Sequence, residues 1–591
     1  GAVMALVATS KCLFSGSRDG TIRYWDLEGG AFLCRKAMRQ GSEVLALSLS
    51  DHALFSGGED RFVVVWCRNT LVPLYRFESS ASQSLAFSSV TQVLFSGGID
   101  DTSVSAWCTR ELCQGEGFMS RSDHNDANSK EWSLEGHLRR LIRLQTVTGD
   151  RSNRDDCWEC AKYLSSLLED MGATTSLIDS TMSEGRINPL LLAKFAAPYP
   201  GAPAVVFYGH YDVQPASGHW ESDPWKLTAI DGYYYARGAT DNKGPILAFV
   251  AAVRDFLAET QGKLPFSINL CLEGQGESFN IGFRDSILAN LQWFANTKIL
   301  LTSNSYWIHD ERPCLTYGMR GSMDFTITVS RPGENLHSGV DGGACAEPMD
   351  DLIAILSEMK DHRGYCRIPH FYDGVRSLTD EEARYFDEVE KDTRARVMED
   401  DRGTKLYLRS DLEKRWCSPS LSITSLSSSN TNQAYSVIPK CVSAKISARF
   451  VPDQHPEELQ GRIRQYLEYE FDKLSSSNRL EVHFEKIGDY WLSNTTVQSF
   501  EIAARAIEKN WGCPPLLVRE GGTMPVTSFL MKTLNCEVVQ IPLGQCSDNA
   551  HLPNERIRVL NLDRGRNVLK DFLLGLRSIL HNGDVVNQEL T

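Results

Sequence analysis

The chain has 591 residues, of which 42% are hydrophobic and 23% charged, and its formal net charge is −15 at pH 7. This length exceeds the roughly 250–300 residues that one hydrophobic core supports, so we expect several globular domains. The acidic charge argues against nucleic acid as a partner, and the absence of an uncharged apolar run of about 18 residues argues against a membrane span. The 16 cysteines lack the regular spacing of a disulfide framework, which favours a reducing compartment, the cytoplasm.

Three segments repeat near the N-terminus. Each combines an LFSG stretch with an acidic turn and a closing tryptophan, and Trp25, Trp66 and Trp107 follow one another at intervals of 41 residues. These segments resemble WD repeats, and we interpret residues 1–114 as a partial propeller of about three blades. Because known propellers have about 4–8 blades, we expect an N-terminally truncated propeller with open strand edges, which serves in binding.

Residues 115–131 are polar and are expected to form a linker. The pattern then alternates helical and β-rich stretches over residues 132–312, as in an α/β domain. Alternating strands dominate residues 313–489, and the α/β pattern returns over 490–581 before a tail at 582–591. The predicted fold is therefore mixed: a partial WD-repeat propeller, then an α/β domain interrupted by an inserted α+β lid or dimerisation domain.

Two segments of this region are given no chemistry. Cys157 and Cys160 form a single C-x-x-C, and we expect both to be ordinary helix residues, because a zinc or redox site needs a second pair or a thioredoxin-like context. The strongly charged residues 378–403 are expected to form a solvent-exposed helix.

Candidate metal ligands follow the ends of several apolar strands. His210 and Asp212 lie two residues apart, so they face the same side of an extended chain. Asp241 lies in a polar turn before an apolar helix, and Glu277 and His551 each follow a later strand. Two histidines with two carboxylates are typical of a zinc site, although a single His–Asp pair after a strand is more often an ordinary surface feature.

Successive motifs in this region resemble those of the carnosinase and aminoacylase family of dinuclear zinc peptidases. They occur in the family's order between about residues 132 and 581 and read GHYDVQP, RGATDNKG, LTYGMRG, LHSG, VIP, RFVP, REGGTMP and HLPNE. The resemblance implies an α/β zinc-peptidase domain with an inserted lid that forms a homodimer.

The resemblance also implies roles for individual residues. His210 would bind one metal, and Asp212 would orient this histidine. Asp241 would bridge both metals through a turn that contains a cis peptide in the family. Glu277 and His551 would complete the second site. His337 would reach across the dimer to stabilise the oxyanion, and Arg449 with Gly521, Gly522 and Thr523 would bind the substrate carboxylate.

Two positions depart from the family pattern. The family loop reads E-G-x-E-E-S-G, whereas this chain reads EGQGESF, so Gly276 stands at the position of the general base and Glu277 at that of the ligand. Because a general base contributes roughly 10²–10⁴-fold in rate, we expect impaired turnover unless another group replaces it. Asn304 stands where the family has an aspartate, so we expect the Zn²⁺ site of His210 and Asn304 to be weak; Mn²⁺ is an alternative metal.

WD repeats joined to this peptidase type resemble the peptidase-family subunits of the fungal glutathione-degrading complex. That resemblance implies a small-peptide or glutathione-derived substrate and a glutamine-amidotransferase-like partner subunit. Two functions stay open: a metallopeptidase of small peptides, or a catalytically degenerate subunit that binds substrate or partner. A third alternative is a domain with a scaffolding role alone.

Overall fold

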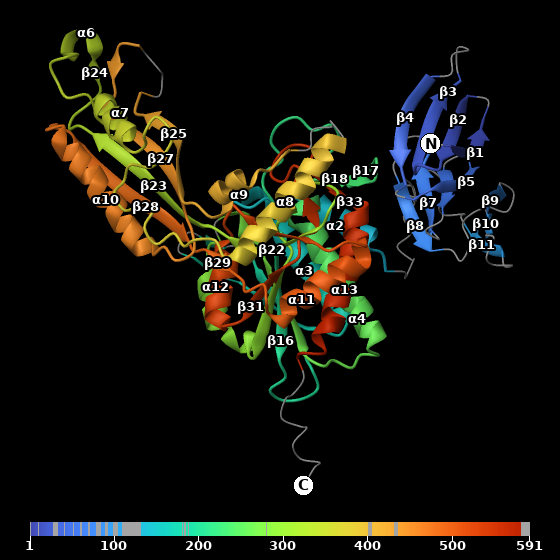
Figure 1. Ribbon diagram of the computed structural model, residues 1–591. Helices are drawn as coiled ribbons and strands as arrows, with labels where there is room; N and C mark the ends of the chain where they lie inside the picture. Colours follow the sequence, from blue (N-terminus) through green and yellow to red (C-terminus); the bar gives the residue numbers. More distant parts are fainter. Residues whose placement is uncertain are drawn as a thin grey trace. The chain divides into compact units, whose positions relative to one another are not determined.

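The structure is a computed structural model, shown as a ribbon in Figure 1. It describes residues 2–108 apart from 10, 28–32, 41, 51–52, 59–61, 69–70, 72, 79–83, 89–92 and 98–103, and residues 132–580 apart from 150, 180, 183–184, 187, 279, 400–404 and 431–434. The expected linker 115–131 and tail 582–591 lie outside the described residues. The chain divides into two compact units, the first made of residues 1–136, 226–236 and 558–560 and the second of the remainder.

The first unit contains three consecutive antiparallel sheets, one for each repeat. The first sheet consists of β1 Val3–Ala8, β2 Cys12–Ser17, β3 Thr21–Asp26 and β4 Leu33–Arg39. The second consists of β5 Val44–Leu49, β6 Ala53–Gly58, β7 Phe62–Cys67 and β8 Pro73–Glu78, and the third of β9 Ser84–Ser88, β10 Val93–Gly97 and β11 Val104–Cys108. The three predicted blades are therefore present as strands of the expected kind.

A shared hydrogen bond explains the LFSG and tryptophan pattern of the blades. The indole of Trp25 donates to Ser15 Oγ at 2.9 Å, and the indole of Trp66 donates to Ser56 Oγ at 2.7 Å. Each tryptophan pairs across the hairpin with the leucine that opens its LFSG stretch, and Trp107 in β11 pairs with Leu94 in the same way. The repeat thus fixes the same cross-strand register three times.

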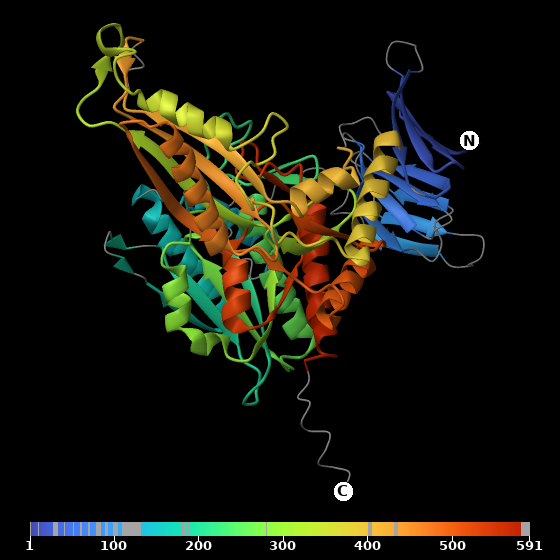
Figure 2. The ribbon, with the colours of Figure 1, turned by 60° about the vertical axis from the view of Figure 1, so that its left-hand side comes forward.

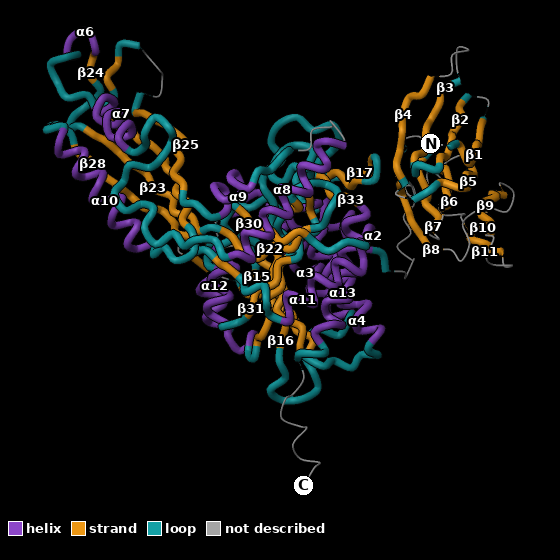
Figure 3. Tube along the Cα trace, viewed as in Figure 1, coloured by secondary structure: helices purple, strands orange, loops and turns teal. Residues whose placement is uncertain are grey.

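A mixed nine-stranded sheet forms the centre of the second unit (Figure 3). Its order is β12 Thr174–Ile178, β15 Leu190–Phe195, β19 Ser267–Glu273, β16 Ala204–His210, β20 Thr297–Thr302, β31 Glu537–Gln540, β22 Cys314–Met319 and β29 Trp491–Leu492, with β30 Leu516–Glu520 also paired to β22. Strands β19, β16, β20 and β31 run parallel. Their carboxyl ends therefore share one edge, where ligands bind in open α/β sheets.

Helices cover both faces of this sheet. On one face, Val206 and Tyr208 pack with side chains of α5 Phe283–Ala289 and α12 Pro525–Leu534. On the other, the rings of Phe207 and Phe249 stack with centroids 4.0 Å apart, which joins β16 to α4 Gly244–Glu259. The remaining helices of this part are α2 Leu134–Arg143, α3 Arg154–Asp170, α11 Gln498–Trp511 and α13 Val559–Leu576.

Cys157 and Cys160 are ordinary buried residues of α3, as expected. Burial raises the pKa of the Cys160 thiol to about 12. Both thiols are therefore protonated at neutral pH and unsuited to redox chemistry.

The inserted segment forms a second sheet with the order β25 Ser420–Ser428, β27 Cys441–Phe450, β23 Gly321–Ser330 and β28 Arg479–Gly488. Burial alternates residue by residue along β23, and its buried face packs against α7 Pro348–Glu358 and α10 Pro456–Lys473 (Figure 2). Strand β22 belongs to the nine-stranded sheet, and the insertion's own sheet begins with β23 at Gly321. This sheet with its two helices is called the lid below.

The charged segment 378–403 differs from its prediction. Most of it forms α8 Asp380–Glu399, but Phe386 and Val389 are fully buried and pack with Trp416 of α9 Arg409–Trp416. The helix therefore has one apolar face against the peptidase sheet, which its many charges conceal in the sequence.

The structure also describes several short strands and the short helix α6. They are β13 Thr181–Met182, β14 Gly185–Arg186, β17 Thr228–Ile230, β18 Tyr233–Tyr235, β21 Tyr306–Trp307, β24 Leu336–His337, α6 Ser338–Asp341, β26 Val437–Ile438, β32 Gly544–Gln545 and β33 Arg556–Arg558. Among the helices described, none has both the length and the apolar character needed to traverse a bilayer.

Candidate metal centre

His210 ends strand β16 and is almost fully buried. Its Nδ1 lies 3.1 Å from the carbonyl oxygen and 3.5 Å from a carboxylate oxygen of Asp212. This leaves Nε2 facing Asp241 Oδ1 at 3.1 Å and Asn304 Nδ2 at 2.9 Å. Burial lowers the pKa of His210, but the carboxylates of Asp212 and Asp241 outweigh it and raise this pKa well above its usual value.

Asp212 is fully buried and also holds the loop that follows β19. Its two carboxylate oxygens accept hydrogen bonds from the backbone N–H groups of Gly276 at 3.0 Å and Glu277 at 2.9 Å. The side chain thus fixes Glu277 as well as His210, a second task that the sequence did not suggest.

Asp241 lies in a buried turn before α4, and its peptide bond to Asn242 is cis. Glu555 forms a cradle for this turn. Its Oε1 accepts from the backbone N–H groups of Thr240 and Asp241 at 3.0 and 3.1 Å, and its Oε2 accepts from Gly238 N at 3.0 Å and Arg237 Nη1 at 2.6 Å. Burial raises the pKa of Glu555 to about 7, against the opposing effect of Arg237.

The two carboxylate oxygens of Asp241 face different histidines. Oδ1 faces His210, whereas Oδ2 lies 3.0 Å from His551 Nε2 and accepts a hydrogen bond from the Tyr306 hydroxyl at 3.1 Å. His551 Nε2 is also 3.0 Å from Glu277 Oε1. This is the arrangement expected of a carboxylate that bridges two cations.

The side chains of this centre fit divalent metal ions. One ligand atom each of His210, Asp241 and Glu277 lies within 4.8 Å of the others. Asp241 Oδ1 and Glu277 Oε1 are buried and have no hydrogen-bond partner, although each faces a histidine nitrogen. Buried anionic oxygens without donors are costly, and a cation would satisfy them.

The histidines and carboxylates of this centre shift one another's pKa values. Hydrogen bonds to Asp241 and Glu277 raise the pKa of His551 to about 10. Burial opposes ionisation of Asp241, but His210 and His551 together hold its pKa below the usual range. Metal binding would therefore release protons from this centre.

Gly276 lies directly against the His210 ring. A Cβ at this position would be 2.7 Å from both Cβ and Cγ of His210, so any side chain requires the loop or the ring to shift. The neighbouring Gln275 accepts from the Thr148 hydroxyl at 2.8 Å. The loop is thus packed closely around Gly276, the position where the family base is expected.

Glu273 ends strand β19, three residues before Gly276, and is 2% exposed. Its Oε2 accepts from the Tyr208 hydroxyl at 2.7 Å and from Asn280 Nδ2 at 2.9 Å. Burial raises the pKa of Glu273 to about 8. Its side-chain direction, which the sequence left open, is therefore toward Tyr208 and Asn280.

The predicted carboxylate-binding residues form a separate group. Arg449 Nη1 donates to Thr523 Oγ1 at 2.6 Å, and Gly521 O accepts from Arg320 Nε at 3.0 Å, while Gly522 is exposed. Burial lowers the pKa of Arg449.

His337 is exposed in β24, which follows strand β23 of the lid sheet in the sequence, and its Nδ1 accepts from Gly339 N at 3.1 Å. Within the described residues, no hydrogen bond or ion pair joins His337 or Arg449 to the metal centre of the same chain. The structure thus brings together His210, Asp212, Asp241, Gly276, Glu277, Asn304 and His551.

Sequence reasoning missed Glu555, Tyr306 and Gln214, whose Nε2 donates to Glu277 Oε2 at 3.0 Å. Each lies within or beside a quoted motif: Glu555 in HLPNE, Tyr306 after Asn304, and Gln214 in GHYDVQP. Their polar character next to expected ligands was the available indication of a supporting role.

Comparison with known proteins identifies relatives of this chain. Residues 206–575 match the model of Peptidase family M20/M25/M40, and residues 1–26 match that of the WD domain, G-beta repeat. The probable di- and tripeptidase DUG2 of Saccharomyces cerevisiae is 31% identical over 93% of this chain, which spans 64% of that protein's length. The Cys-Gly metallodipeptidase DUG1 of Candida albicans is 32% identical over 74% of this chain and 93% of its own length.

Solved structures agree with these matches. The di-peptidase Dug1p of Saccharomyces cerevisiae has a TM-score of 0.66 at 30% identity, covering 75% of this chain and 96% of that one. Human carnosine dipeptidase 1 has a TM-score of 0.65 at 30% identity, covering 75% and 96%. The expected resemblance and the mixed fold are confirmed, and the chain belongs to peptidase family M20/M25/M40, with WD-repeat strands preceding the peptidase domain.

Proposed function

We propose that the chain is a metallopeptidase subunit that acts on small peptides in glutathione degradation, through attack of metal-activated water on an amide bond. The observation that carries this proposal is the placement of Asp241 between two histidines, one at each carboxylate oxygen. The names of the relatives, a di- and tripeptidase and a Cys-Gly metallodipeptidase, support a short peptide as the substrate.

Asp241 would be shared by two Zn²⁺ sites. His210 and Asn304 would complete the first, and Glu277 and His551 the second, with Mn²⁺ as an alternative metal. The bound ions supply Lewis-acid polarisation of the amide carbonyl and make the attacking water more acidic. An amide oxygen carries no charge, so the site of His210 and Asn304 is expected to be the weaker one.

Other residues would orient the reactants. Asp212 holds His210 and the backbone of Glu277, and Glu555 holds the Asp241 turn. Arg449 with Gly521, Gly522 and Thr523 would bind the substrate carboxylate, since a guanidinium and a hydroxyl already lie together there. His337 from a second copy of the chain would donate to the carbonyl oxygen, which requires a homodimer formed through the lid.

Proton removal is the weak step of this mechanism. Gly276 offers no base, and the tight contact with His210 leaves no room there for a carboxylate without rearrangement. Turnover should therefore be lower by roughly 10²–10⁴-fold than in a relative with the base.

The lack of a base at Gly276 also favours a second function, a degenerate subunit that binds substrate for a glutamine-amidotransferase-like partner. Titration calorimetry of Cys-Gly and of glutathione, paired with turnover assays on the same metal-loaded sample, separates the two. Turnover supports the peptidase, whereas binding without turnover supports the binding subunit.

The domain division proposed is a partial propeller at 1–114, a peptidase domain at 132–312 and 490–581, and an insertion at 313–489. We also place the protein in the cytoplasm. The thirteen cysteines whose side chains the structure describes are all free thiols, which suits a reducing compartment.

A further inference from the structure

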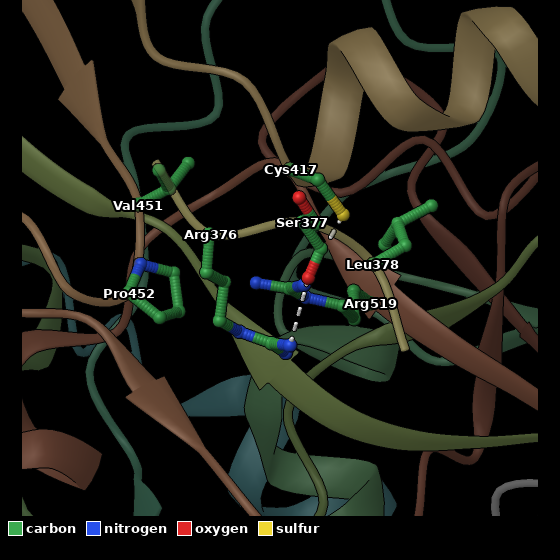
Figure 4. Close-up of a pocket in the computed structure, with 7 residues that line it drawn as sticks. All are labelled: Arg376, Ser377, Leu378, Cys417, Val451, Pro452 and Arg519. Atoms are coloured by element: carbon green, nitrogen blue, oxygen red, sulfur yellow. Dashed lines mark hydrogen bonds between the residues drawn. The ribbon is translucent and has the colours of Figure 1, made fainter. Parts of the chain in front are cut away.

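A small cavity lies where four segments of the second unit meet (Figure 4), and none of the metal ligands lines it. The segments are the residues before α8, the residue after α9, and the ends of β27 and β30. The empty space, including solvent at its mouth, is about 200 Å³. Its lining residues are Arg376, Ser377, Leu378, Cys417, Val451, Pro452 and Arg519.

Two arginines point toward each other in this cavity and keep unfilled donors. Arg519 is 2% exposed, and its Nη1 donates to Cys417 Sγ at 3.1 Å and to Glu382 Oε1 at 3.4 Å, but its buried Nε has no hydrogen-bond partner. Arg376 Nη2 donates to the same Glu382 Oε1 at 2.6 Å, while its Nη1 reaches Ser377 O at 3.5 Å, the limit of a hydrogen bond. A guanidinium has five N–H donors, so both arginines still have N–H groups that can donate to a further ligand.

The two guanidiniums share one buried carboxylate. Glu382 shares one carboxylate oxygen between the two guanidiniums, and its other oxygen accepts from Thr379 N at 3.1 Å. Asp453 lies 4.0 Å from Arg376 Nε, but it is 59% exposed, so solvent screens its charge. Arg376, which is 27% exposed, is therefore left without a buried counter-charge of its own, and a bound anion would supply one.

Other charged groups near the cavity include further arginines and the acidic Glu413 and Glu520. Burial raises the pKa of the Cys417 thiol to about 11, so the thiol is neutral and supplies no negative charge. Burial, together with the charges of Arg449, Arg415 and Arg519, lowers the pKa of Arg320 to about 10. The cavity thus adjoins a wider arginine-rich region.

We propose that this cavity binds a small monovalent anion of halide size between the guanidiniums of Arg376 and Arg519. Guanidinium groups are weakly hydrated and suit such ions, and the apolar side chains of Leu378, Val451 and Pro452 limit competing water. Arg519 directly precedes the Glu520–Thr523 segment, and Val451 follows Arg449 by two residues. A bound anion would therefore tie together the two segments whose Arg449 and Thr523 side chains hydrogen-bond to each other. The anion site itself does not depend on peptide hydrolysis.

The test uses bromide as the probe and the full chain. The melting temperature is measured against increasing sodium bromide, with sodium gluconate at equal ionic strength as the reference, since gluconate is too bulky for the cavity. We expect a saturable rise with bromide alone. Arg376→Gln should weaken the apparent bromide affinity about tenfold or more, the loss expected for one charge-assisted hydrogen bond.

Arg462→Gln is the matched control, because Arg462 is 33% exposed against 27% for Arg376 and also pairs with a glutamate, Glu458. It should leave the bromide response unchanged. Equal shifts in bromide and gluconate, or equal responses of the two variants, would overturn the proposal. If Arg376→Gln does not fold, the anomalous signal of a bromide-soaked crystal decides: a peak between Arg376 and Arg519 supports the site, and an empty cavity refutes it.

Discussion

Glu555 supports the metal centre without touching it, because it binds the backbone of the Asp241 turn through both carboxylate oxygens. A glutamine has one acceptor oxygen, and its amide N–H₂ would face backbone N–H donors. Glu555→Gln should therefore lower the free energy of unfolding by about 3 kcal/mol, the range for a broken buried ion pair. It should also weaken metal binding by roughly 10–100-fold, as measured by competition with a chelator.

The control for this variant is Glu501→Gln, because Glu501 is 58% exposed and pairs with Arg505 alone among the ion pairs of the described chain. Its effect on metal affinity should be undetectable. Equal metal affinity in Glu555→Gln and the natural protein would show that the cradle does not position Asp241.

Gly276 allows a direct test of the missing base. Gly276→Glu adds both a Cβ and a carboxylate, whereas Gly276→Ala adds the Cβ that meets His210 at 2.7 Å. We expect Gly276→Ala to cost about 1–3 kcal/mol through overpacking. If the base is the missing group, Gly276→Glu combined with Asn304→Asp should show far greater metal-dependent dipeptide turnover than Gly276→Ala combined with the same second change.

Equal turnover in the two double mutants, both folded, would show that the lack of a carboxylate at position 276 does not limit hydrolysis. Metal content of each variant is measured at the same time, since Asn304→Asp adds a negative charge beside His210 and should strengthen that metal site.

The ligands could be predicted from the sequence because each lies at a strand end or in a turn within a recognisable motif. Their supporting contacts could not. Glu555 meets the Asp241 turn across more than 300 positions of sequence. The contact of Gly276 with His210 depends on the path of two loops, which strand patterns do not specify.

At the scale of elements, α8 is held to the loop between β21 and β22 by a partly buried charge network. Asp392 accepts from His309 Nε2 at 2.7 Å and pairs with Arg396 at 2.8 Å and Arg312 at 3.3 Å. Asp392→Asn should lower the free energy of unfolding by about 2 kcal/mol, because charge-assisted hydrogen bonds are lost. Asp387→Asn, on the same helix but 58% exposed, should cost less than about 1 kcal/mol.

The effect of Asp392 should depend on pH. Burial raises its pKa, but His309 and Arg396 outweigh burial and hold this pKa below the ordinary value. The stabilisation is then present above about pH 4 and is lost as the pH falls below the pKa of the unfolded state. The difference in melting temperature between the natural protein and Asp392→Asn should therefore narrow between pH 7 and about pH 3. A constant difference would contradict this contribution.

Elements with a regular sequence pattern could be predicted from the sequence, whereas elements with a mixed pattern could not. The WD strands repeat one register, and β23 alternates burial along its length. In α8, charges surround Phe386 and Val389, so composition suggested solvent exposure although these two side chains are buried. Contacts with the rest of the fold, and not composition, determine which face of α8 is buried.

At the scale of the whole molecule, the exposed edge of the lid sheet offers a surface for the proposed homodimer. Strand β25 is an edge strand, and its Ile423 and Leu426 are 42% and 56% exposed. Such edges pair readily with a second chain. Light scattering at micromolar concentration should give a dimer, and Leu426→Lys should shift it toward the monomer.

Ile487→Lys on β28, the opposite edge strand of the same sheet, is the matched control, since Ile487 is 40% exposed. It should leave the dimer intact. A monomer in the natural protein would remove His337 from the proposed mechanism.

The measurement that tests the central claim most directly is Cys-Gly turnover by the purified chain with Zn²⁺ or Mn²⁺, compared between the natural protein, Asp241→Ala and the exposed-site control Asp223→Ala. The account predicts slow turnover that needs the metal, is lost with Asp241→Ala and is kept with Asp223→Ala. Turnover that survives either a chelator or the loss of Asp241 would contradict it, as would no turnover at all in a metal-loaded natural protein.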